Sequence, residues 1–127
     1  MDDRRYSFYI VDDDEVFVRL LSRFLEPLSH TIDSATSSRT ALEDIPRKRP
    51  DCLLLDMMMP GLDGLELLKR LRAVPGLDKM KVIMVTGKSY EFDRQQAFGF
   101  GADGYIIKPI VMRDLAKAVG RALNPES

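Results

Sequence analysis

The most informative part of the sequence is Leu53-Leu54-Leu55-Asp56-Met57-Met58-Met59-Pro60-Gly61-Leu62-Asp63-Gly64. The three leucines form a short apolar run of the kind that a buried strand requires, and Asp56 follows them directly. Pro60 and Gly61 then favour a turn over further strand, because proline lacks a backbone donor and glycine accepts turn conformations. The chain therefore delivers one carboxylate, that of Asp56, from a buried strand into a turn, which is where a reactive Asp would be placed.

Apolar runs and helical spacing divide the rest of the chain into alternating elements. The runs predict strands at 7–11, 31–35, 53–55, 82–85 and 104–107. Helical spacing, N-cap candidates and terminating residues predict helices at 15–25, 39–45, 64–74, 91–98 and 112–123. Five strands alternating with five helices predict an α/β fold with a five-stranded parallel sheet and helices on both faces.

Two of the predicted helices carry a more specific expectation. In the helix at 15–25, Val16, Leu20, Leu21 and Phe24 recur at helical spacing and are expected to form its apolar face. The helix at 39–45 is expected to be closed by Pro46, because proline breaks helical hydrogen bonding.

Polar side chains follow four of the predicted strands. They are the acidic run Asp12, Asp13 and Asp14, and then Asp56, Thr86 and Lys108. Ligands gather at the carboxyl ends of strands in such sheets, so these residues can converge although they are distant in sequence. Carboxylates brought together repel each other unless a cation lies between them, and Mg²⁺ prefers oxygen ligands. We therefore expect Mg²⁺ bound by an acidic pair, Asp56 and the backbone carbonyl of Met58.

The predicted site also contains an ammonium group and a hydroxyl group. Lys108 and Thr86 would lie beside the carboxylate of Asp56, next to the metal. A metal, an ammonium and a hydroxyl around one carboxylate oxygen are the elements of phosphoryl transfer with Asp as nucleophile. The acidic pair is expected to be Asp12 and Asp13, which directly follow the strand, and the alternative is Asp13 with Asp14. In the first case Asp14 would cap the following helix.

Composition narrows the classes of partner and compartment. The chain has 127 residues, which predicts one domain, residues 1–127 with a core at about 7–123, and no output domain after the last helix. Its 19 Lys and Arg residues balance 20 Asp and Glu residues, so no direct binding of nucleic acid or of a membrane surface is expected. Cys52 is the only cysteine and cannot form an internal disulfide, which indicates a buried thiol in a reducing, cytoplasmic compartment.

Between about Phe8 and Leu123 the chain resembles the CheY-like receiver domains of two-component response regulators, which have a flavodoxin-like (βα)5 fold. The resemblance rests on Phe8-Tyr9-Ile10-Val11-Asp12-Asp13, on Pro50-Asp51 leading to the 56–64 segment, on Val85-Thr86-Gly87, and on Gly101-Ala102-Asp103-Gly104-Tyr105-Ile106-Ile107-Lys108-Pro109. It implies Asp56 as the phosphoacceptor, Asp12 and Asp13 as magnesium ligands, and Thr86 and Lys108 as contacts of the phosphoryl group. It also implies Tyr105 as an aromatic switch and a cis Lys108–Pro109 peptide.

The resemblance further implies what such a chain does. A histidine kinase, a phosphotransfer protein or a small phosphodonor would supply the phosphoryl group. The surface formed by the elements at 91–98, 104–107 and 112–123 would then signal to an effector protein. The chain would assist its own phosphorylation and dephosphorylation without being an enzyme. Met58 offers no polar group to orient an attacking water, so slow self-dephosphorylation is expected, and the sequence leaves open whether a homodimer forms.

Two other functions compete with this interpretation. The segment Asp12-Asp13-Asp14-Glu15-Val16 also fits the start of haloacid-dehalogenase-like phosphatases, with Asp12 as nucleophile. That family needs an acidic motif well downstream of its lysine, whereas only Asp114 and Glu126 follow Lys108, and Asp56 would have no role. The second competitor is an interaction module of the same fold that accepts no phosphate.

Overall fold

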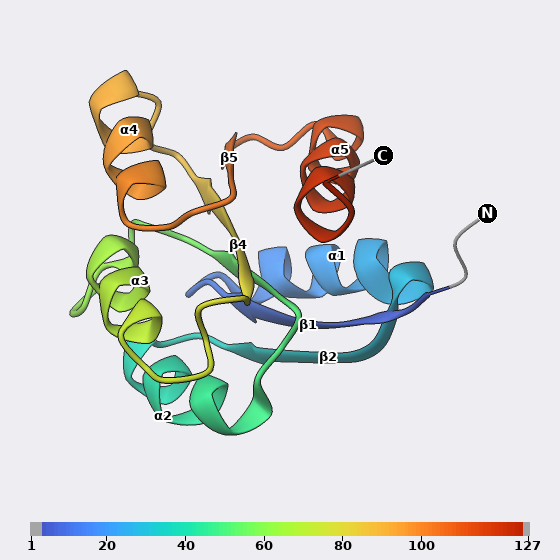
Figure 1. Ribbon diagram of the computed structural model, residues 1–127. Coiled ribbons are helices and arrows are strands. Elements are labelled where there is room, and N and C mark those ends of the chain that lie inside the picture. The colour runs from blue at the N-terminus through green and yellow to red at the C-terminus, as the bar shows by residue number, and fades with distance from the viewer. Residues whose placement is uncertain (1–3, 126–127) are drawn as a thin grey trace.

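The structure is a computed structural model that describes residues 4–125. Five strands alternate with five α-helices along the chain (Figure 1). In order they are β1 (Tyr6–Val11), α1 (Glu15–Leu25), a short 3₁₀ turn η1 (Glu26–Leu28), β2 (Ser29–Ala35), α2 (Ser38–Lys48), β3 (Cys52–Leu55), α3 (Gly64–Arg72), β4 (Lys81–Thr86), α4 (Glu91–Gly99), β5 (Gly104–Ile107) and α5 (Met112–Leu123).

The strands form one parallel sheet in the order β2-β1-β3-β4-β5. Helices α1 and α5 cover one face of this sheet, and α2, α3 and α4 lie on the other (Figure 1). The predicted α/β fold, with helices on both faces of a five-stranded parallel sheet, is confirmed. The register aligns the carboxyl ends of neighbouring strands. Val11 at the end of β1 pairs with Leu55 at the end of β3, and Thr86 at the end of β4 pairs with Ile107 at the end of β5.

Alternate residues of the central strands enter two separate apolar clusters. On β1 and β3, the side chains facing α2 and α3 are Tyr9, Val11, Leu53 and Leu55. Those facing α1 and α5 are Phe8, Ile10, Cys52 and Leu54. Because both faces are covered, these strands are continuous apolar runs and do not alternate with polar residues. Cys52 is a fully buried free thiol, as the sequence predicted.

The apolar face predicted for α1 is only partly right. The helix spans the predicted residues, but the side chains that it buries are Val18, Leu21 and Leu25. Val16 and Leu20 are 67% and 50% exposed. The buried residues recur at i, i+3 and i+7, as expected for one face of a helix. The face that packs on the sheet is therefore rotated from the predicted one.

Pro46 does not close α2, which was the prediction. The helix continues to Lys48 with Pro46 inside its last turn. Proline removes only the one donor that would bond the carbonyl of Leu42. The amide of Arg49 still donates to the carbonyl of Ile45 at 2.8 Å. The helix therefore ends at Lys48, and its C-cap residue Arg49 has a φ of 50°, in the left-handed region.

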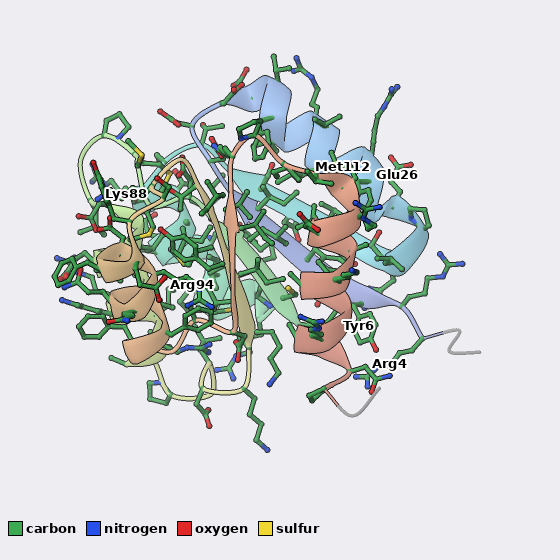
Figure 2. All side chains as sticks on the ribbon, turned by 90° about the horizontal axis from the view of Figure 1, so that it is seen from above. Arg4, Tyr6, Glu26, Lys88, Arg94 and Met112 are labelled. Atoms are coloured by element: carbon green, nitrogen blue, oxygen red, sulfur yellow. The ribbon has the colours of Figure 1, made fainter. Side chains whose placement is uncertain are left out.

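Helix α4 is less buried than the other helices of the sheet faces. Its only buried residue is Ala97, while Phe92 and the preceding Tyr90 are 68% and 76% exposed. Viewed from above, Lys88 and Arg94 lie on this side of the molecule and Met112 lies at the start of α5 on the other (Figure 2). Within residues 4–125, no helix combines the length and the apolar character needed to cross a lipid bilayer.

Candidate phosphoryl-transfer site

The polar residues singled out in the sequence meet at one edge of the sheet. Asp12 follows β1, Asp56 follows β3, Thr86 is the last residue of β4, and Lys108 follows β5. All four strands are parallel and in register, so their carboxyl ends reach the same edge. Asp12, Asp56 and Thr86 are the only charged or polar residues besides Ser38 that the described part of the chain buries.

Three carboxylates form a cluster at this edge. One oxygen of each of Asp12, Asp13 and Asp56 lies within 4.8 Å of the others, with Asp12 and Asp56 buried and Asp13 exposed. Asp14 has a different role, since its side chain accepts the amide hydrogens of Val16 and Phe17 and caps α1. The structure therefore groups Asp13 with Asp12 and uses Asp14 as the helix cap.

This cluster suits a hard divalent cation. It offers only carboxylate oxygens, two of them from buried residues, which is the donor chemistry that Mg²⁺ prefers. Burial raises the pKa of Asp12 above its usual value, and the charge of Asp56 acts in the same direction. Lys108 and the amide of Asp14 lower that pKa but do not offset the effect of burial. A cation bound here would thus stabilise the charged form of Asp12, which burial disfavours.

Lys108 connects the two buried carboxylates. Its Nζ lies 2.8 Å from Oδ2 of Asp12 and 3.6 Å from Oδ2 of Asp56. Burial lowers the pKa of Lys108, but the hydrogen bond and charge of Asp12 and the charge of Asp56 outweigh this and leave it raised. The ammonium form is therefore retained throughout the neutral range. The backbone amide of Lys108 donates to the carbonyl of Thr86 at 2.8 Å, and the Lys108–Pro109 peptide is cis.

Backbone hydrogen bonds hold Asp56 in place at the start of the loop after β3. The amide of Met58 donates to Oδ1 of Asp56 at 3.0 Å, and the amide of Asp56 donates to the carbonyl of Val11 at 3.0 Å. Where the loop meets α3, a Cβ on Gly64 would clash with the carbonyl oxygen of Asp56, so only glycine fits. The side chain of Met58 is 54% exposed and contributes no polar atom beside Asp56.

Thr86 and Tyr105 are linked through the backbone of Lys88. The amide of Lys88 donates to Oγ1 of the fully buried Thr86 at 3.3 Å. The hydroxyl of Tyr105 donates to the carbonyl of Lys88 at 2.8 Å and lies 3.4 Å from the sulfur of Met57. The backbone of Lys88, in the β4–α4 loop, therefore connects the hydroxyl of Thr86 to the aromatic ring of Tyr105 on β5.

One residue of the site was not predicted from the sequence. The ring centroid of Phe17, in the first turn of α1, lies 4.4 Å from Nζ of Lys108. Phe17 and Lys108 come from opposite ends of the chain, and no local pattern pairs them. The only local signal is that Phe17 comes three residues after Asp14, the N-cap of α1. The side chain of Asp14 accepts the amide of Phe17 and so holds the backbone of Phe17 in place.

Comparison with known proteins agrees with this geometry. Residues 8–120 match the family described as the response regulator receiver domain. The phosphate regulon transcriptional regulatory protein PhoB of Rhizobium meliloti is 34% identical over 120 residues, covering 92% of this chain and 53% of that protein. The alkaline phosphatase synthesis regulator PhoP of Bacillus subtilis is 36% identical over 115 residues, covering 91% of this chain and 47% of that protein.

Solved structures of response regulators and their receiver domains superpose closely on this chain. The chemotaxis protein CheY4 of Vibrio cholerae superposes with a TM-score of 0.86 at 25% identity, covering 94% of this chain and 99% of that one. The BeF3-activated DrrB receiver domain gives a TM-score of 0.82 at 25% identity, covering 94% of this chain and 97% of that one.

The chain therefore belongs to the receiver domain family of two-component response regulators. It spans about half the length of the curated relatives, whose names as transcriptional regulators describe the whole of those longer proteins. The haloacid-dehalogenase-like alternative, with Asp12 as nucleophile, finds no support in these comparisons.

Proposed function

We propose that this chain accepts a phosphoryl group on Asp56 in a reaction that needs Mg²⁺. The observation that carries the proposal is the position of Lys108, whose ammonium lies between the buried carboxylates of Asp12 and Asp56 at the carboxyl edge of the sheet. Such an ammonium stabilises negative charge that develops on a phosphoryl group at Asp56.

The proposed transfer is an in-line displacement at phosphorus. An oxygen of Asp56 forms the new bond to phosphorus, while the bond from phosphorus to the donor breaks and its electron pair leaves with the donor. Asp12, Asp13, Asp56 and the backbone carbonyl of Met58 would hold Mg²⁺, which when bound neutralises the phosphoryl oxygens. Lys108 and the hydroxyl of Thr86 would bond the other phosphoryl oxygens. The chain contributes positioning and charge to its own modification, and we do not class it as an enzyme.

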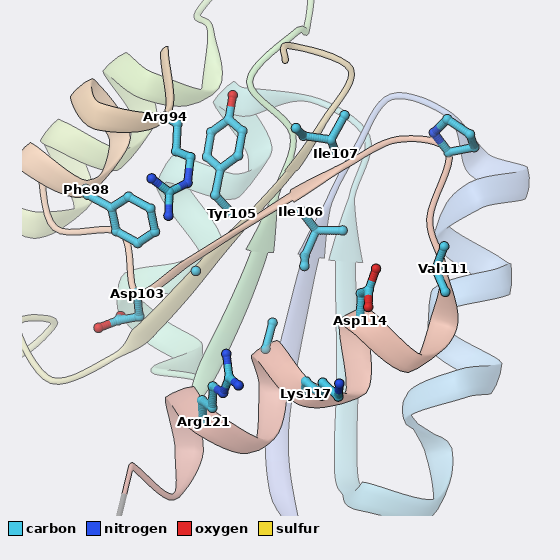
Figure 3. A pocket seen from close by; sticks show the side chains of 13 residues that line it. Arg94, Phe98, Asp103, Tyr105, Ile106, Ile107, Val111, Asp114, Lys117 and Arg121 are labelled. Carbon is cyan, nitrogen blue, oxygen red and sulfur yellow. The ribbon is translucent and has the colours of Figure 1, made fainter. Parts of the chain in front are cut away.

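The signal would leave through the surface formed by α4, β5 and α5. A hollow of about 520 Å³ lies on this surface, and Figure 3 shows Arg94 and Phe98 of α4, Tyr105 of β5, and Lys117 and Arg121 of α5 around it. Tyr105 belongs both to this hollow and to the hydrogen bond with Lys88. A change at Thr86 would reach Tyr105 through Lys88 and shift the populations of two surface conformations.

The proposal also names partners and a compartment. A histidine kinase or a phosphotransfer protein would donate the phosphoryl group, and an effector protein would bind the α4–β5–α5 surface. Direct binding of nucleic acid is not part of the proposal, because the charges of the chain balance. We place the chain in the cytoplasm, a compartment that suits its free, buried Cys52 thiol. The described residues form one receiver domain in this proposal.

The test is phosphorylation from a small donor. The chain is incubated with acetyl phosphate, with Mg²⁺ or with EDTA, and the bound phosphate is measured by intact mass. One acid-labile phosphate per chain that requires Mg²⁺ and is lost in Asp56→Asn supports the proposal. No phosphate on the wild-type chain, together with no binding of beryllofluoride, overturns it in favour of an interaction module. Many turnovers of a phosphomonoester would instead indicate a phosphatase.

A further inference from the structure

The ammonium of Lys108 has a third neighbour besides its two carboxylates. The ring centroid of Phe17 lies 4.4 Å from Nζ, well inside the roughly 6 Å over which a ring face attracts a cation. Asp12 lies at 2.8 Å and Asp56 at 3.6 Å. The charged end of Lys108 thus lies among residues that follow β1 and β3 and a residue in the first turn of α1.

The same loop fixes both Asp12 and Phe17. The amide of Asp14 donates to Oδ1 of Asp12 at 2.9 Å, and the side chain of Asp14 accepts the amide of Phe17 at 3.2 Å. Phe17 is half-buried and packs against the apolar cluster under α1. Its ring therefore has a defined place relative to the carboxylate that binds Lys108.

The ring face of Phe17 interacts with the ammonium of Lys108 in a different way from the carboxylates of Asp12 and Asp56. The ammonium has three N–H donors, and the carboxylate of Asp12 takes one of them. A ring attracts the positive charge through its quadrupole, but it offers no lone pair of the kind that a carboxylate presents. It therefore restrains the position of Nζ while donors stay available on the side of Asp56.

We propose that Phe17 is a positioning residue for Lys108 and holds its ammonium where it can bond a phosphoryl oxygen on Asp56. This inference rests on the proposed phosphorylation of Asp56. An aliphatic residue at position 17 would fill the same apolar space but would leave Nζ free to move away from Asp56.

The test compares four chains for their affinity for beryllofluoride with Mg²⁺, which together imitate a phosphoryl group on Asp56. Phe17→Leu is expected to bind about five-fold more weakly than the wild type, and Phe17→Tyr, which keeps the ring, is expected to match it. Phe24→Leu is the matched control. Phe24 is also half-buried on α1 and packs against the same cluster, but it lies two helical turns, about 10 Å, further along the helix.

Three results would overturn the proposal. They are equal affinity in Phe17→Leu and the wild type, equal weakening in Phe17→Tyr, and equal weakening in Phe24→Leu. A measurement on the wild-type chain needs no variant: the ring should move the Lys108 ε-CH₂ proton signals upfield in the NMR spectrum. Signals at the ordinary position would also overturn it. If the wild type binds no beryllofluoride, the phosphorylation proposal fails, while the ring shift still reports on Phe17 and Lys108.

Discussion

Lys108 and Asp12 are separated by 96 positions in the sequence, yet Nζ of Lys108 lies 2.8 Å from Oδ2 of Asp12. The ammonium is farther from Asp56, whose Oδ2 lies 3.6 Å from Nζ. Without a phosphoryl group, Lys108 is therefore held mainly by the carboxylate of Asp12, which follows β1. On phosphorylation of Asp56, we expect Lys108 to exchange part of this contact for a phosphoryl oxygen.

Lys108→Ala is expected to slow phosphorylation of the chain by acetyl phosphate roughly a hundred-fold, because the charge that stabilises the transferring group is lost. Magnesium binding should persist, since the three carboxylates remain. Phosphate incorporation and magnesium affinity, measured separately, check the two statements. Lys79→Ala, at an exposed position away from the cluster, should behave as the wild type. An unchanged rate in Lys108→Ala would show that Lys108 does not act on the phosphoryl group.

Asp12→Asn is expected to raise the free energy of unfolding in the absence of metal. Burial raises the pKa of Asp12 in the folded chain, so its charged form is unfavourable there at neutral pH. The same substitution should reduce the stabilisation that Mg²⁺ gives to the wild type. Urea unfolding with EDTA and with Mg²⁺ measures both effects. Asp14→Asn, which conserves the helix cap, should keep the magnesium effect. Lower stability of Asp12→Asn in EDTA would contradict this account.

Met58→Asn is expected to shorten the lifetime of phosphorylated Asp56 by roughly ten-fold or more, because an amide can orient an attacking water and a thioether cannot. The wild type should lose its phosphate slowly for the same reason. The decay of the phosphorylated protein after removal of the donor measures this. Met58→Leu, which is also apolar, should decay as the wild type does. Loss of the wild-type phosphate within seconds would refute the prediction.

Tyr9→Phe is expected to cost about 1 kcal/mol of stability at neutral pH, because the buried hydroxyl of Tyr9 donates to Oδ2 of Asp44 at 2.8 Å. Burial, and then the hydrogen bond and charge of Asp44, raise the pKa of Tyr9 above its usual 10.0.

The raised pKa of Tyr9 also gives a pH dependence. Above pH 10 the unfolded chain loses the phenolic proton while the folded chain keeps it, so the folded state binds more protons and stability falls as the pH rises. Tyr9→Phe should flatten this decline in urea unfolding between neutral and alkaline pH. Tyr90→Phe, at an exposed tyrosine, should leave the decline unchanged. Identical slopes for Tyr9→Phe and the wild type would count against the role of Tyr9.

Arg72→Ala is expected to lower stability by about 2 kcal/mol or more, because it removes the guanidinium donor shared by several part-buried carbonyls. The guanidinium of Arg72 donates to the carbonyls of Leu77, Met80 and Gly101 at 3.0, 2.6 and 2.6 Å, and so ties the end of α3 to the loop before β5. Thermal or urea unfolding checks this value. Arg70→Ala, which removes an exposed pair with Glu66, should change stability by less than about 0.5 kcal/mol.

Much of this protein could be predicted from its sequence. Periods of apolar residues located all five strands and all five helices, and α1, β5 and α5 have the predicted bounds. The parallel arrangement then required the residues after β1, β3, β4 and β5 to share one edge of the sheet. Predictions from local patterns were wrong where the same local sequence allows two structures. Pro46 could end a helix or lie in its last turn, and α1 could bury either of two neighbouring faces.

The sequence by itself determined the order of the elements and the edge of the sheet at which Asp56, Thr86 and Lys108 lie, because these follow from short-range periodicity and from parallel strands. The expected grouping of Asp13 with Asp12, with Asp14 as the cap of α1, is the one that the structure has. Only the tertiary structure decided that Tyr105 bonds Lys88 and that the ring of Phe17 faces Lys108. Such pairings depend on how helices rotate and loops close against the sheet. That is set by packing among residues far apart in the chain, and no local pattern of residue types records it.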